Sequence, residues 1–201
     1  MNRPLTILAL AAITACAVLA GALPARAQTG IQFDGTNDYV TFGQATATLG
    51  TPTFTLECWF RRTGAGAITS TGTGGITNAI PLLTKGRGEA EASTADCNYF
   101  MGIRQSDSVL VADYEEGTGQ ASPALNHPIA GRTPIRRNVW YHGAATFDGT
   151  TLRLFLNGRL EATVVVGPGR LPQSLSAQHA ALATGLTTAP AAAGFLSLIH
   201  I

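Results

Sequence analysis

The stretch "TFDGTTLRLFLNGRLEATVVV", residues 146–166, decides the fold, because it predicts antiparallel strands joined by very short turns. Asp148-Gly149 separates the run "VWYHGAATF" from "TLRLFL", and Asn157-Gly158 separates "TLRLFL" from "RLEATVVV". An Asn-Gly pair favours a type I′ turn, in which both central residues take positive φ and the twist matches that of the flanking strands. We therefore expect three consecutive strands that pair as a meander.

The alternation of apolar residues in this stretch predicts which face of the meander is buried. Leu152, Leu154 and Leu156 fall on one face of the middle strand, because successive side chains of a strand point to opposite faces. The third strand has an apolar face of the same kind, formed by Leu160, Ala162, Val164 and Val166. We therefore expect consecutive strands to bury the same side of one sheet.

Short alternating runs recur from Gln28 onward. In "TPTFTLECWF", residues 51–60, one face carries the apolar residues Phe54, Leu56, Cys58 and Phe60, and the other carries Thr55, Glu57 and Trp59. Residues 98–103 and 109–114 predict two further strands, whereas residues 63–79 and 115–138 predict long loops, the first uncharged and with little to bury. Short strands separated by Gly, Pro, Asn and Asp are typical of an all-β sandwich or barrel.

The first residues have the features of a secretory signal. A positive start, an apolar run over residues 5–22 and an Ala-x-Ala ending at Ala27 predict cleavage after residue 27. An uncleaved membrane anchor and a lipoprotein modified at Cys16 are the two alternatives. We expect residues 1–27 to be a signal peptide and the protein to be secreted, periplasmic or displayed on the cell surface, with no further association with a membrane.

The charge and the cysteine content limit which partners and which chemistry the protein can have. Only 12% of the residues are charged and the formal net charge is +1, so the chain lacks the basic stripe that nucleic acid requires. Beyond the signal peptide the remaining cysteines are Cys58 and Cys97. A pair of cysteines in an oxidising compartment predicts a disulfide, and two buried free thiols are the alternative.

Motifs for catalysis are missing from the sequence. It contains no Gly-x-Ser-x-Gly elbow, no His-Glu-x-x-His pair and no phosphate-binding loop with its lysine. Glu115 and Glu116 are adjacent, so on a strand they would point to opposite faces and could not flank a glycosidic bond. We expect the protein not to be an enzyme.

Aromatic residues are the candidates for sugar binding. A sugar-binding surface needs an exposed ring with polar groups beside it. Trp59 meets this requirement if its face is open, because Thr55, Glu57 and Arg61 share that face. The other candidates, at strand ends or in the long loop, are Tyr99, Tyr114 and His127. For each candidate a structural role is the alternative, and for Trp59 this would be packing beneath the loop 63–79. For Trp140 and His142 a core position and an internal hydrogen bond are expected in the same way.

Oxygen-bearing side chains suggest a place for calcium. Ca²⁺ takes six to eight oxygen ligands, commonly from Asp, Glu, Asn and backbone carbonyls of loops. The segment "FDGTND" offers Asp34, Asn37 and Asp38, and a turn stabilised by these side chains is the alternative. The acidic segment at residues 88–96 is a second region of this kind, with a solvated loop as the alternative.

Four segments together resemble the laminin-G-like jelly-roll domains of the concanavalin A-like lectin and glucanase group. They are "IQFDGTNDYVTF" at residues 31–42, "FTLECWF" at 54–60, "IPLLTKG" at 80–86 and "WYHGAATFDGTTLRLFLNGRLEA" at 140–162. The resemblance implies a two-sheet jelly roll over residues 28–195 that binds rather than catalyses, as one module of a larger secreted or surface protein. Some members of the group bind glycans, some bind proteins and others hold Ca²⁺ at the rim. The Glu-x-Asp-x-x-Glu pattern of the related glucanases does not occur.

The last six residues depart from the family pattern. Similar domains continue past a "GF" like that at residues 194–195 into a closing strand with an Asp-Glu pair and a Trp, whereas this chain reads "LSLIHI". That tail resembles the translation of a transposon adaptor used in library preparation. We expect residues 196–201 to be non-native, residues 31–42 to lack their strand partner, and the natural chain to continue. A natural apolar C-terminus is the alternative.

These observations together predict a non-catalytic, extracellular binding module for a glycan or a protein, with Ca²⁺ as the one cofactor considered. The alternative is a structural spacer or adhesion module without a small ligand, and a glycan hydrolase is disfavoured by the absent carboxylates. Exposed aromatic residues over a groove would favour the first reading, and a flat polar surface would favour the second.

Overall fold

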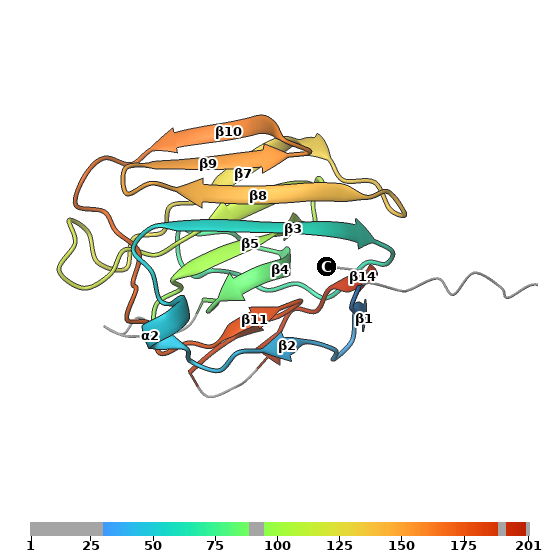
Figure 1. Cartoon of the computed structure of the whole chain (residues 1–201), viewed down its shortest axis with the longest axis horizontal. Coiled ribbons are helices and arrows are strands. Elements are labelled where there is room, and N and C mark those ends of the chain that lie inside the picture. Colours follow the sequence, from blue (N-terminus) through green and yellow to red (C-terminus); the bar gives the residue numbers. More distant parts are fainter. Residues whose placement is uncertain (1–29, 89–94, 189–191, 200–201) are drawn as a thin grey trace, which may run out of the picture.

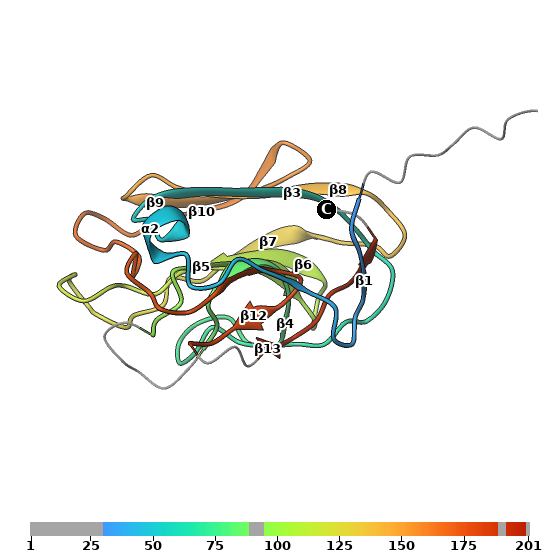
Figure 2. The ribbon, with the colours of Figure 1, turned by 60° about the horizontal axis from the view of Figure 1, so that its bottom comes forward.

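The computed structural model describes residues 30–88, 95–188 and 192–199, and these form two β-sheets stacked face to face (Figure 1). The paired strands of the described residues are all antiparallel, and the two layers are seen edge-on in Figure 2. The predicted all-β, two-sheet jelly-roll sandwich is confirmed. The signal peptide predicted for residues 1–27 lies outside the described residues.

The first sheet has the strand order β1-β14-β3-β8-β9-β10. Its strands are β1 (Gln32–Asp34), β14 (Ser197–Ile199), β3 (Phe54–Arg62), β8 (Tyr141–Phe147), β9 (Thr151–Leu156) and β10 (Arg159–Val165). The strands β8, β9 and β10 are consecutive in the chain and adjacent in the sheet, as the meander prediction requires.

The second sheet has the strand order β2-β11-β4-β5-β6-β7. Its strands are β2 (Val40–Thr41), β11 (Ala180–Leu182), β4 (Ala79–Lys85), β5 (Tyr99–Arg104), β6 (Val109–Asp113) and β7 (Ile129–Pro134). Three further short elements are the paired strands β12 (Gly185–Leu186) and β13 (Ala192–Ala193) and the single-turn helix α2 (Thr46–Leu49). No helix in the described part of the chain is long and apolar enough to cross a membrane.

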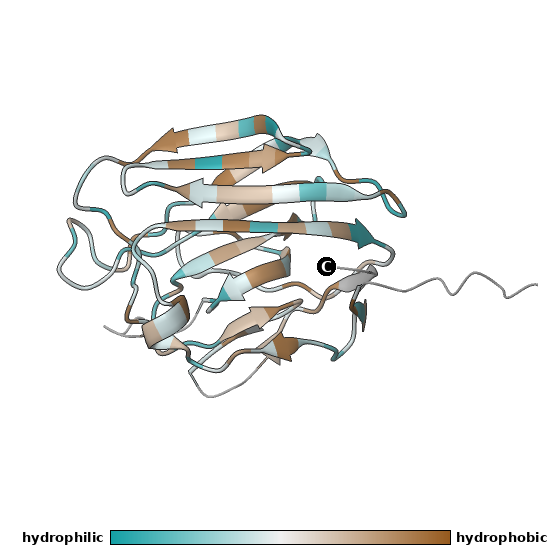
Figure 3. Ribbon diagram, viewed as in Figure 1, coloured by the Kyte–Doolittle hydropathy of each residue, from teal (hydrophilic) through white to brown (hydrophobic). Residues whose placement is uncertain are grey.

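The main core lies between the two sheets and follows the predicted alternation. In β3, Phe54, Leu56, Cys58 and Phe60 are buried, while Thr55, Glu57 and Trp59 are exposed. Hydrophobic and hydrophilic residues follow one another along β3 and β9 (Figure 3). Leu152, Leu154 and Leu156 of β9 belong to the same buried cluster. The side chains on the outer face of the first sheet therefore point away from this core.

One residue of the meander departs from the predicted alternation. Leu160 was expected on the buried face, but it is 58% exposed and pairs with Phe155. The register of β9 and β10 shifts between Leu160 and Ala162, so Glu161 is an extra residue on β10. A β-bulge of this kind reverses the face of the residues on one side of it. Ala162, Val164 and Val166 still pack against the core as predicted.

The turn between β9 and β10 has the predicted geometry. Asn157 and Gly158 have φ values of 51° and 74°, as both central residues of a type I′ turn require. An added Cβ at Gly158 would have no atom within 4 Å, so the backbone conformation alone opposes a side chain there.

We expect Gly158→Ala to lower the free energy of unfolding by about 1 kcal/mol, because alanine in the left-handed region costs that much. Urea denaturation measures the change. Gly158→Asn is the matched control and should cost less, since asparagine tolerates positive φ. Equal losses of unfolding free energy in the two variants would contradict the view that Gly158 is needed for its positive φ.

The loop over residues 63–79 buries more than the sequence suggested. Its residue Ile76 packs into a second hydrophobic cluster with five residues of the second sheet and its borders, namely Ala79, Cys97, Phe100, Val109 and Val111. Thr71 is also fully buried, and its hydroxyl donates to Asp113 Oδ2 at 2.5 Å. The expectation of little to bury is therefore wrong, and the loop is a cover on the second sheet.

The predicted disulfide is absent from the structure. Cys58 and Cys97 are both buried free thiols, which was the alternative reading. Cys58 belongs to the core between the sheets, and Cys97 belongs to the second cluster beneath the loop. Burial raises the pKa of Cys58 to about 12. Burial, with the nearby carboxylates of Asp113 and Glu115, also raises the pKa of Cys97.

The N-terminal strand has a partner. β14 pairs with β1, placing Leu198 opposite Phe33, and it also pairs with the end of β3. The expectation that residues 31–42 lack a strand partner is therefore wrong. The assignment of residues 196–201 as non-native sequence stays a prediction.

Candidate functional site

Large aromatic side chains gather on the outer face of the first sheet. We call this group the aromatic patch, and it consists of Glu57, Trp59, Arg61, Trp140, His142 and Phe155. Three strands supply it, because residues directly opposite on paired strands share a face of the sheet. The patch lies on the side of β3 and β8 that faces away from the core.

The pairing of β3 with β8 sets the neighbours within the patch. Trp59 lies opposite His142, and their ring centroids are 5.3 Å apart. One step along the strands, the guanidinium of Arg61 lies over the ring of Trp140, with its carbon 5.6 Å from the ring centroid. Such a cation–π contact fixes the orientation of both side chains. The patch is therefore an ordered surface with two adjacent aromatic pairs.

Both tryptophans are open to solvent. Trp59 is 59% exposed, so the loop 63–79 does not cover it, and the alternative in which it packs beneath that loop is wrong. Trp140 is 41% exposed, which excludes the core position expected for it. Exposed tryptophans in adjacent rows are unusual on a protein surface, because their burial elsewhere would stabilise the fold. Exposed apolar surface of this kind is a feature of interaction sites in proteins.

Polar groups border the rings. The carboxylate of Glu57 is exposed, and its Oε2 lies 3.7 Å from Nε2 of His142. In the next row Glu57, Ala144 and Phe155 lie side by side across β3, β8 and β9. Ala144 carries only a methyl group, so the centre of this row is lower than its two ends. The patch thus offers flat apolar rings with an acceptor at Glu57 and donors at Arg61 and His142.

Two of the predicted ligand-binding residues lie inside the protein. Tyr99 is buried on the inner face of the second sheet, and burial raises its pKa to about 12. Tyr114 is fully buried, and its hydroxyl donates to the carbonyl of Arg170 at 2.7 Å. Both side chains pack against Phe54. Tyr114 fills the core and does not meet the surface, whereas Tyr99 packs in the core and also lines a groove between β3 and the second sheet.

His127 belongs to a cluster of polar side chains at one end of the sandwich. Its Nε2 lies 2.7 Å from Oε1 of Glu116, which also accepts a bond from Arg170 at 2.7 Å. The amide of Ser122 donates to the other oxygen of Glu116. Burial raises the pKa of Glu116, but these hydrogen bonds outweigh burial and the pKa is lowered. The cluster joins three loop segments, and its side chains form their hydrogen bonds with one another.

The segment proposed for calcium forms a turn. Asp34 Oδ1 accepts the amides of Thr36 at 2.7 Å and Asn37 at 3.2 Å, while Asp38 Oδ2 accepts the amide of Asp34. The hydrogen bonds from Thr36 and Asn37 are the main reason why the pKa of Asp34 is lowered. In the described residues no three side chains of His, Cys, Asp or Glu form a metal-binding group. Most of the acidic segment 88–96 lies outside the described residues.

Sequence reasoning found part of the patch and missed the rest. Trp59, Glu57 and Arg61 were placed on one face of a strand, and the structure brings His142 and Trp140 beside them. Phe155 was missed, although the alternation of "TLRLFL" already puts it on the face opposite the buried leucines. The sequence did not show which strand pairs with β3 or in which register, because the register between β3 and β8 cannot be read from either strand alone.

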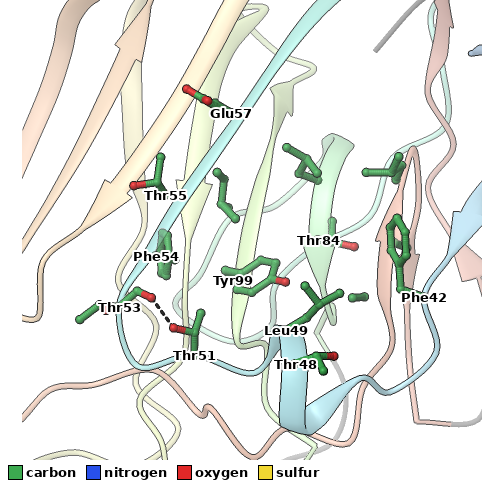
Figure 4. Close-up of a pocket in the computed structure, with 15 residues that line it drawn as sticks. Phe42, Thr48, Leu49, Thr51, Thr53, Phe54, Thr55, Glu57, Thr84 and Tyr99 are labelled. Carbon is green, nitrogen blue, oxygen red and sulfur yellow. Dashed lines mark hydrogen bonds between the residues drawn. The ribbon is translucent and has the colours of Figure 1, made fainter. Parts of the chain in front are cut away.

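A groove is the second surface feature of note. We call it the edge groove; its volume is about 610 Å³, and it lies between β3 of the first sheet and β4, β5 and β11 of the second (Figure 4). Most of its lining is apolar, and Phe42 and Leu49 stand at its rim with 52% and 37% exposure. Glu57 is the charged side chain among its lining residues. The polar groups of its lining are Glu57, Tyr99 and five threonines, namely Thr48, Thr51, Thr53, Thr55 and Thr84.

Comparisons with known proteins agree with the fold. The family model for the concanavalin A-like lectin/glucanases superfamily matches residues 34–199. No curated protein sequence matches the chain.

Solved structures show the same architecture at low identity. The chain is similar to the CBM40 module of the Ruminococcus gnavus IT-sialidase, with 16% identity, a TM-score of 0.54, and coverage of 85% of this chain and 83% of that chain. A structure of the same module bound to α2,6-sialyllactose has 14% identity, a TM-score of 0.56 and 85% coverage of each chain. The Caenorhabditis elegans galectin LEC-6 has 14% identity, a TM-score of 0.41, and coverage of 86% of this chain and 95% of that chain.

Proposed function

Because the chain belongs to the concanavalin A-like lectin/glucanases superfamily, we propose that it is a non-catalytic glycan-binding module that takes its ligand on the aromatic patch. The observation that carries the proposal is the exposure of Trp59 beside His142, Glu57 and Arg61 on one ordered face. A tryptophan ring can stack on the apolar face of a pyranose while neighbouring polar groups bind the hydroxyls.

Three further arguments support binding without catalysis. Glu57 stands on the patch without a second carboxylate in the patch, whereas glycoside hydrolysis needs a pair across the scissile bond. The buried Glu116 is held by His127 and Arg170, so it is not available as an acid or nucleophile. A flat aromatic face also suits recognition of a sugar chain better than enclosure of a reacting bond.

The ligand class is proposed from a solved neighbour of the same fold. Sialylated oligosaccharides are the first glycans to test, because the Ruminococcus gnavus module of the same fold has been solved with α2,3- and α2,6-sialyllactose. We also propose export to the cell surface, the periplasm or the medium, and Ca²⁺ at Asp34, Asn37 and Asp38 as a contribution to be tested by chelation. A spacer module without a small ligand is the competing reading.

Tryptophan fluorescence tests the location of the site. The chain contains two tryptophans, and both belong to the patch, so any sugar that stacks there must change their emission. We expect titration with a bound glycan to shift the emission maximum and to protect the tryptophans from acrylamide. Binding detected by calorimetry without a change in either signal would place the ligand elsewhere.

We expect Trp59→Ala to weaken glycan binding about 30-fold, because loss of a central aromatic contact costs about 2 kcal/mol. Stability should change by less than about 1 kcal/mol, since the ring is exposed. Isothermal titration calorimetry measures the affinity. Leu175→Ala is the matched control, because Leu175 is 68% exposed in a loop outside the patch. Equal affinity of the Trp59→Ala and Leu175→Ala variants would show that the aromatic patch is not the glycan-binding site.

A further inference from the structure

We propose that the aromatic patch selects glycans that carry an anionic group, with a sugar ring on Trp59 and the carboxylate or sulfate at Arg61. This inference rests on the proposed function and narrows it to one chemical class of ligand. It is supported by two arginine doublets that meet beside the patch, by their lack of ion pairs among the described residues, and by the spacing of Trp59 and Arg61.

The arginine doublets Arg61-Arg62 and Arg136-Arg137 are far apart in the sequence but meet in the structure. The first doublet ends β3, and the second lies in the connection from β7 to β8, at the same end of the first sheet (Figure 1). The amide of Asn138 donates to the carbonyl of Arg62 at 2.8 Å, which joins this connection to the end of β3. Burial lowers the pKa of Arg62, and the nearby positive charge of Arg137 lowers it further.

Arg62 is a buried cation that forms no ion pair in the described part of the chain. Its guanidinium donates to three neutral acceptors, the carbonyl oxygens of Gly64 at 2.9 Å and Ala65 at 3.3 Å and the hydroxyl of Ser108 at 3.2 Å. These hydrogen bonds hold the group in place without neutralising its charge. Because a buried charge is screened less than an exposed one, Arg62 adds to the positive potential at this end of the patch.

The other three arginines can reach a ligand. Arg136 and Arg137 are exposed, and Arg61 is partly exposed. None of the ion pairs between described residues includes any of the three. Guanidinium groups bind carboxylate and sulfate-like anions through charge-assisted hydrogen bonds, often in pairs. An anion placed at Arg61 would therefore meet donors that no carboxylate of the described residues already occupies.

The acidic side chains around this end of the sheet are engaged or lie apart from it. Asp107 pairs with Arg104 at 2.6 Å. Asp34 of β1, two strands away from β3, accepts the amides of its own turn. Glu57 is the acidic member of the aromatic patch, and it lies at the opposite end of the patch from Arg61. The patch therefore has one basic end, where an anion is favoured.

The spacing of the patch suits two neighbouring parts of one ligand. Trp59 and Arg61 are alternate residues of β3, so they lie on the same face about 7 Å apart. The ring of Trp140 lies under the guanidinium of Arg61 and fixes its position. A sugar stacked on Trp59 thus brings a charged substituent, or the next sugar of the chain, to Arg61. A neutral glycan can use the rings but leaves the arginines without an anion.

A change in the ligand tests the proposal without altering the protein. A glycan array carries sialylated, uronic-acid-containing, sulfated and neutral oligosaccharides, and each acidic probe is also printed uncharged, as the amide or the desulfated sugar. We expect the protein to bind acidic probes and the uncharged forms to bind at least about 10-fold more weakly, because charge-assisted hydrogen bonds are lost. Equal binding of the two forms, or a preference for neutral glycans, would overturn the proposal and leave the proposed function standing. Binding to no glycan would contradict both.

Variants test whether Arg61 is the residue that binds the anion. We expect Arg61→Gln to weaken binding of the acidic probe at least about 10-fold and to change binding of its uncharged form by less than about twofold. Arg132→Gln is the matched control, because Arg132 is exposed on β7 of the other sheet and its loss removes the same charge. Equal effects of the two variants, or equal weakening of the acidic and uncharged probes by Arg61→Gln, would overturn the proposal.

A single-stranded DNA oligonucleotide distinguishes this site from a general attraction for polyanions. At the same salt concentration we expect the oligonucleotide to bind at least about 10-fold more weakly than the acidic glycan, because the charged area is small. We also expect Trp59→Ala to weaken binding of the acidic glycan, since its ring stacks there. Oligonucleotide binding as strong as glycan binding, with both unaffected by Trp59→Ala, would show a general polyanion surface and overturn the proposal.

Discussion

Replacing Lys85 by alanine is expected to lower the free energy of unfolding by about 4 kcal/mol. Lys85 is the single lysine of the chain, and it is fully buried. Its ammonium group donates to three backbone carbonyls, those of Gln44 at 2.6 Å, Ser176 at 2.9 Å and Gln178 at 2.8 Å. The alanine variant leaves these carbonyls without their donor and leaves a cavity where the side chain lay.

The position of Lys85 explains why the loss should be large. Lys85 lies at the end of β4, while Gln44 precedes α2 and the other two carbonyls precede β11, so one side chain joins three segments. Burial lowers the pKa of Lys85 to about 8, and the group remains a cation at neutral pH. Removing the partner of buried polar groups costs more than the net value of the bonds themselves.

Urea denaturation at pH 7 measures the effect of Lys85→Ala. Arg153→Ala is the control for loss of a cation, because Arg153 pairs with Asp148 at the exposed turn, and it should cost no more than about 1 kcal/mol. A mass-spectrometric test of burial is also available: an amine-acylating reagent should modify Lys85 in urea and spare it in the folded protein. A similar loss in both variants, or rapid acylation of the folded protein, would contradict the role assigned to Lys85.

The second large effect is a pH dependence that comes from Asp113. This side chain is fully buried, and burial raises its pKa from 3.8 to about 7 despite hydrogen bonds from Thr71, Ile76 and Asn126. A carboxyl group with a raised pKa binds more protons in the folded state, so it stabilises the fold at low pH and this contribution is lost as pH rises toward 7. Over about three pH units the contribution amounts to about 4 kcal/mol.

We expect Asp113→Asn to flatten the pH dependence of the free energy of unfolding between about pH 4 and pH 7. The amide resembles the protonated acid, so the variant keeps its stability where the parent loses it. Urea denaturation at several pH values gives the free energy of unfolding of both proteins. The difference between the parent and the variant at each pH is the contribution of the Asp113 carboxyl group. Asp107→Asn is the control, because Asp107 is exposed and its pKa is lowered by Arg104. The same flattening in Asp107→Asn would contradict the assignment to Asp113.

The sequence predicted the sheets well because its signals were local. The alternation in residues 54–60 identified the buried face of β3, and Asn157-Gly158 identified a turn whose positive φ values the structure contains. The exception, Leu160, comes from a bulge at Glu161. The carboxylate of Glu161 accepts the amides of Arg132 and Thr133 on β7, and this tertiary contact has no trace in the local alternation.

The candidate site was predicted less completely because it depends on pairing between distant strands. Trp59 and His142 are far apart in the chain and become neighbours only through the register of β3 with β8. Tyr114 and His127 were chosen as aromatic or ionisable residues near loops, yet the structure uses them for packing against Phe147 and for holding Glu116. Residue type indicated the chemistry, and burial decided which residues can meet a ligand.

Three features of the structure lie in different places. The loop 63–79 and the buried polar groups around Asp113 stabilise the second sheet, with Thr71 and Ile76 as the loop's contacts. The edge groove lies between the sheets, and the aromatic patch lies on the outer face of the first sheet. β3 takes part in the last two, and its residue Glu57 belongs to both the patch and the lining of the groove.

A glycan array that compares the parent with a Trp59→Ala/Trp140→Ala double variant tests whether the aromatic patch binds glycans. Both proteins are probed with Ca²⁺ and with a chelator, after circular dichroism has shown that both are folded. We expect the parent to bind at least one class of oligosaccharide and the double variant to bind none. This expectation is contradicted if the folded parent binds no glycan under either condition, or if the double variant retains the binding of the parent.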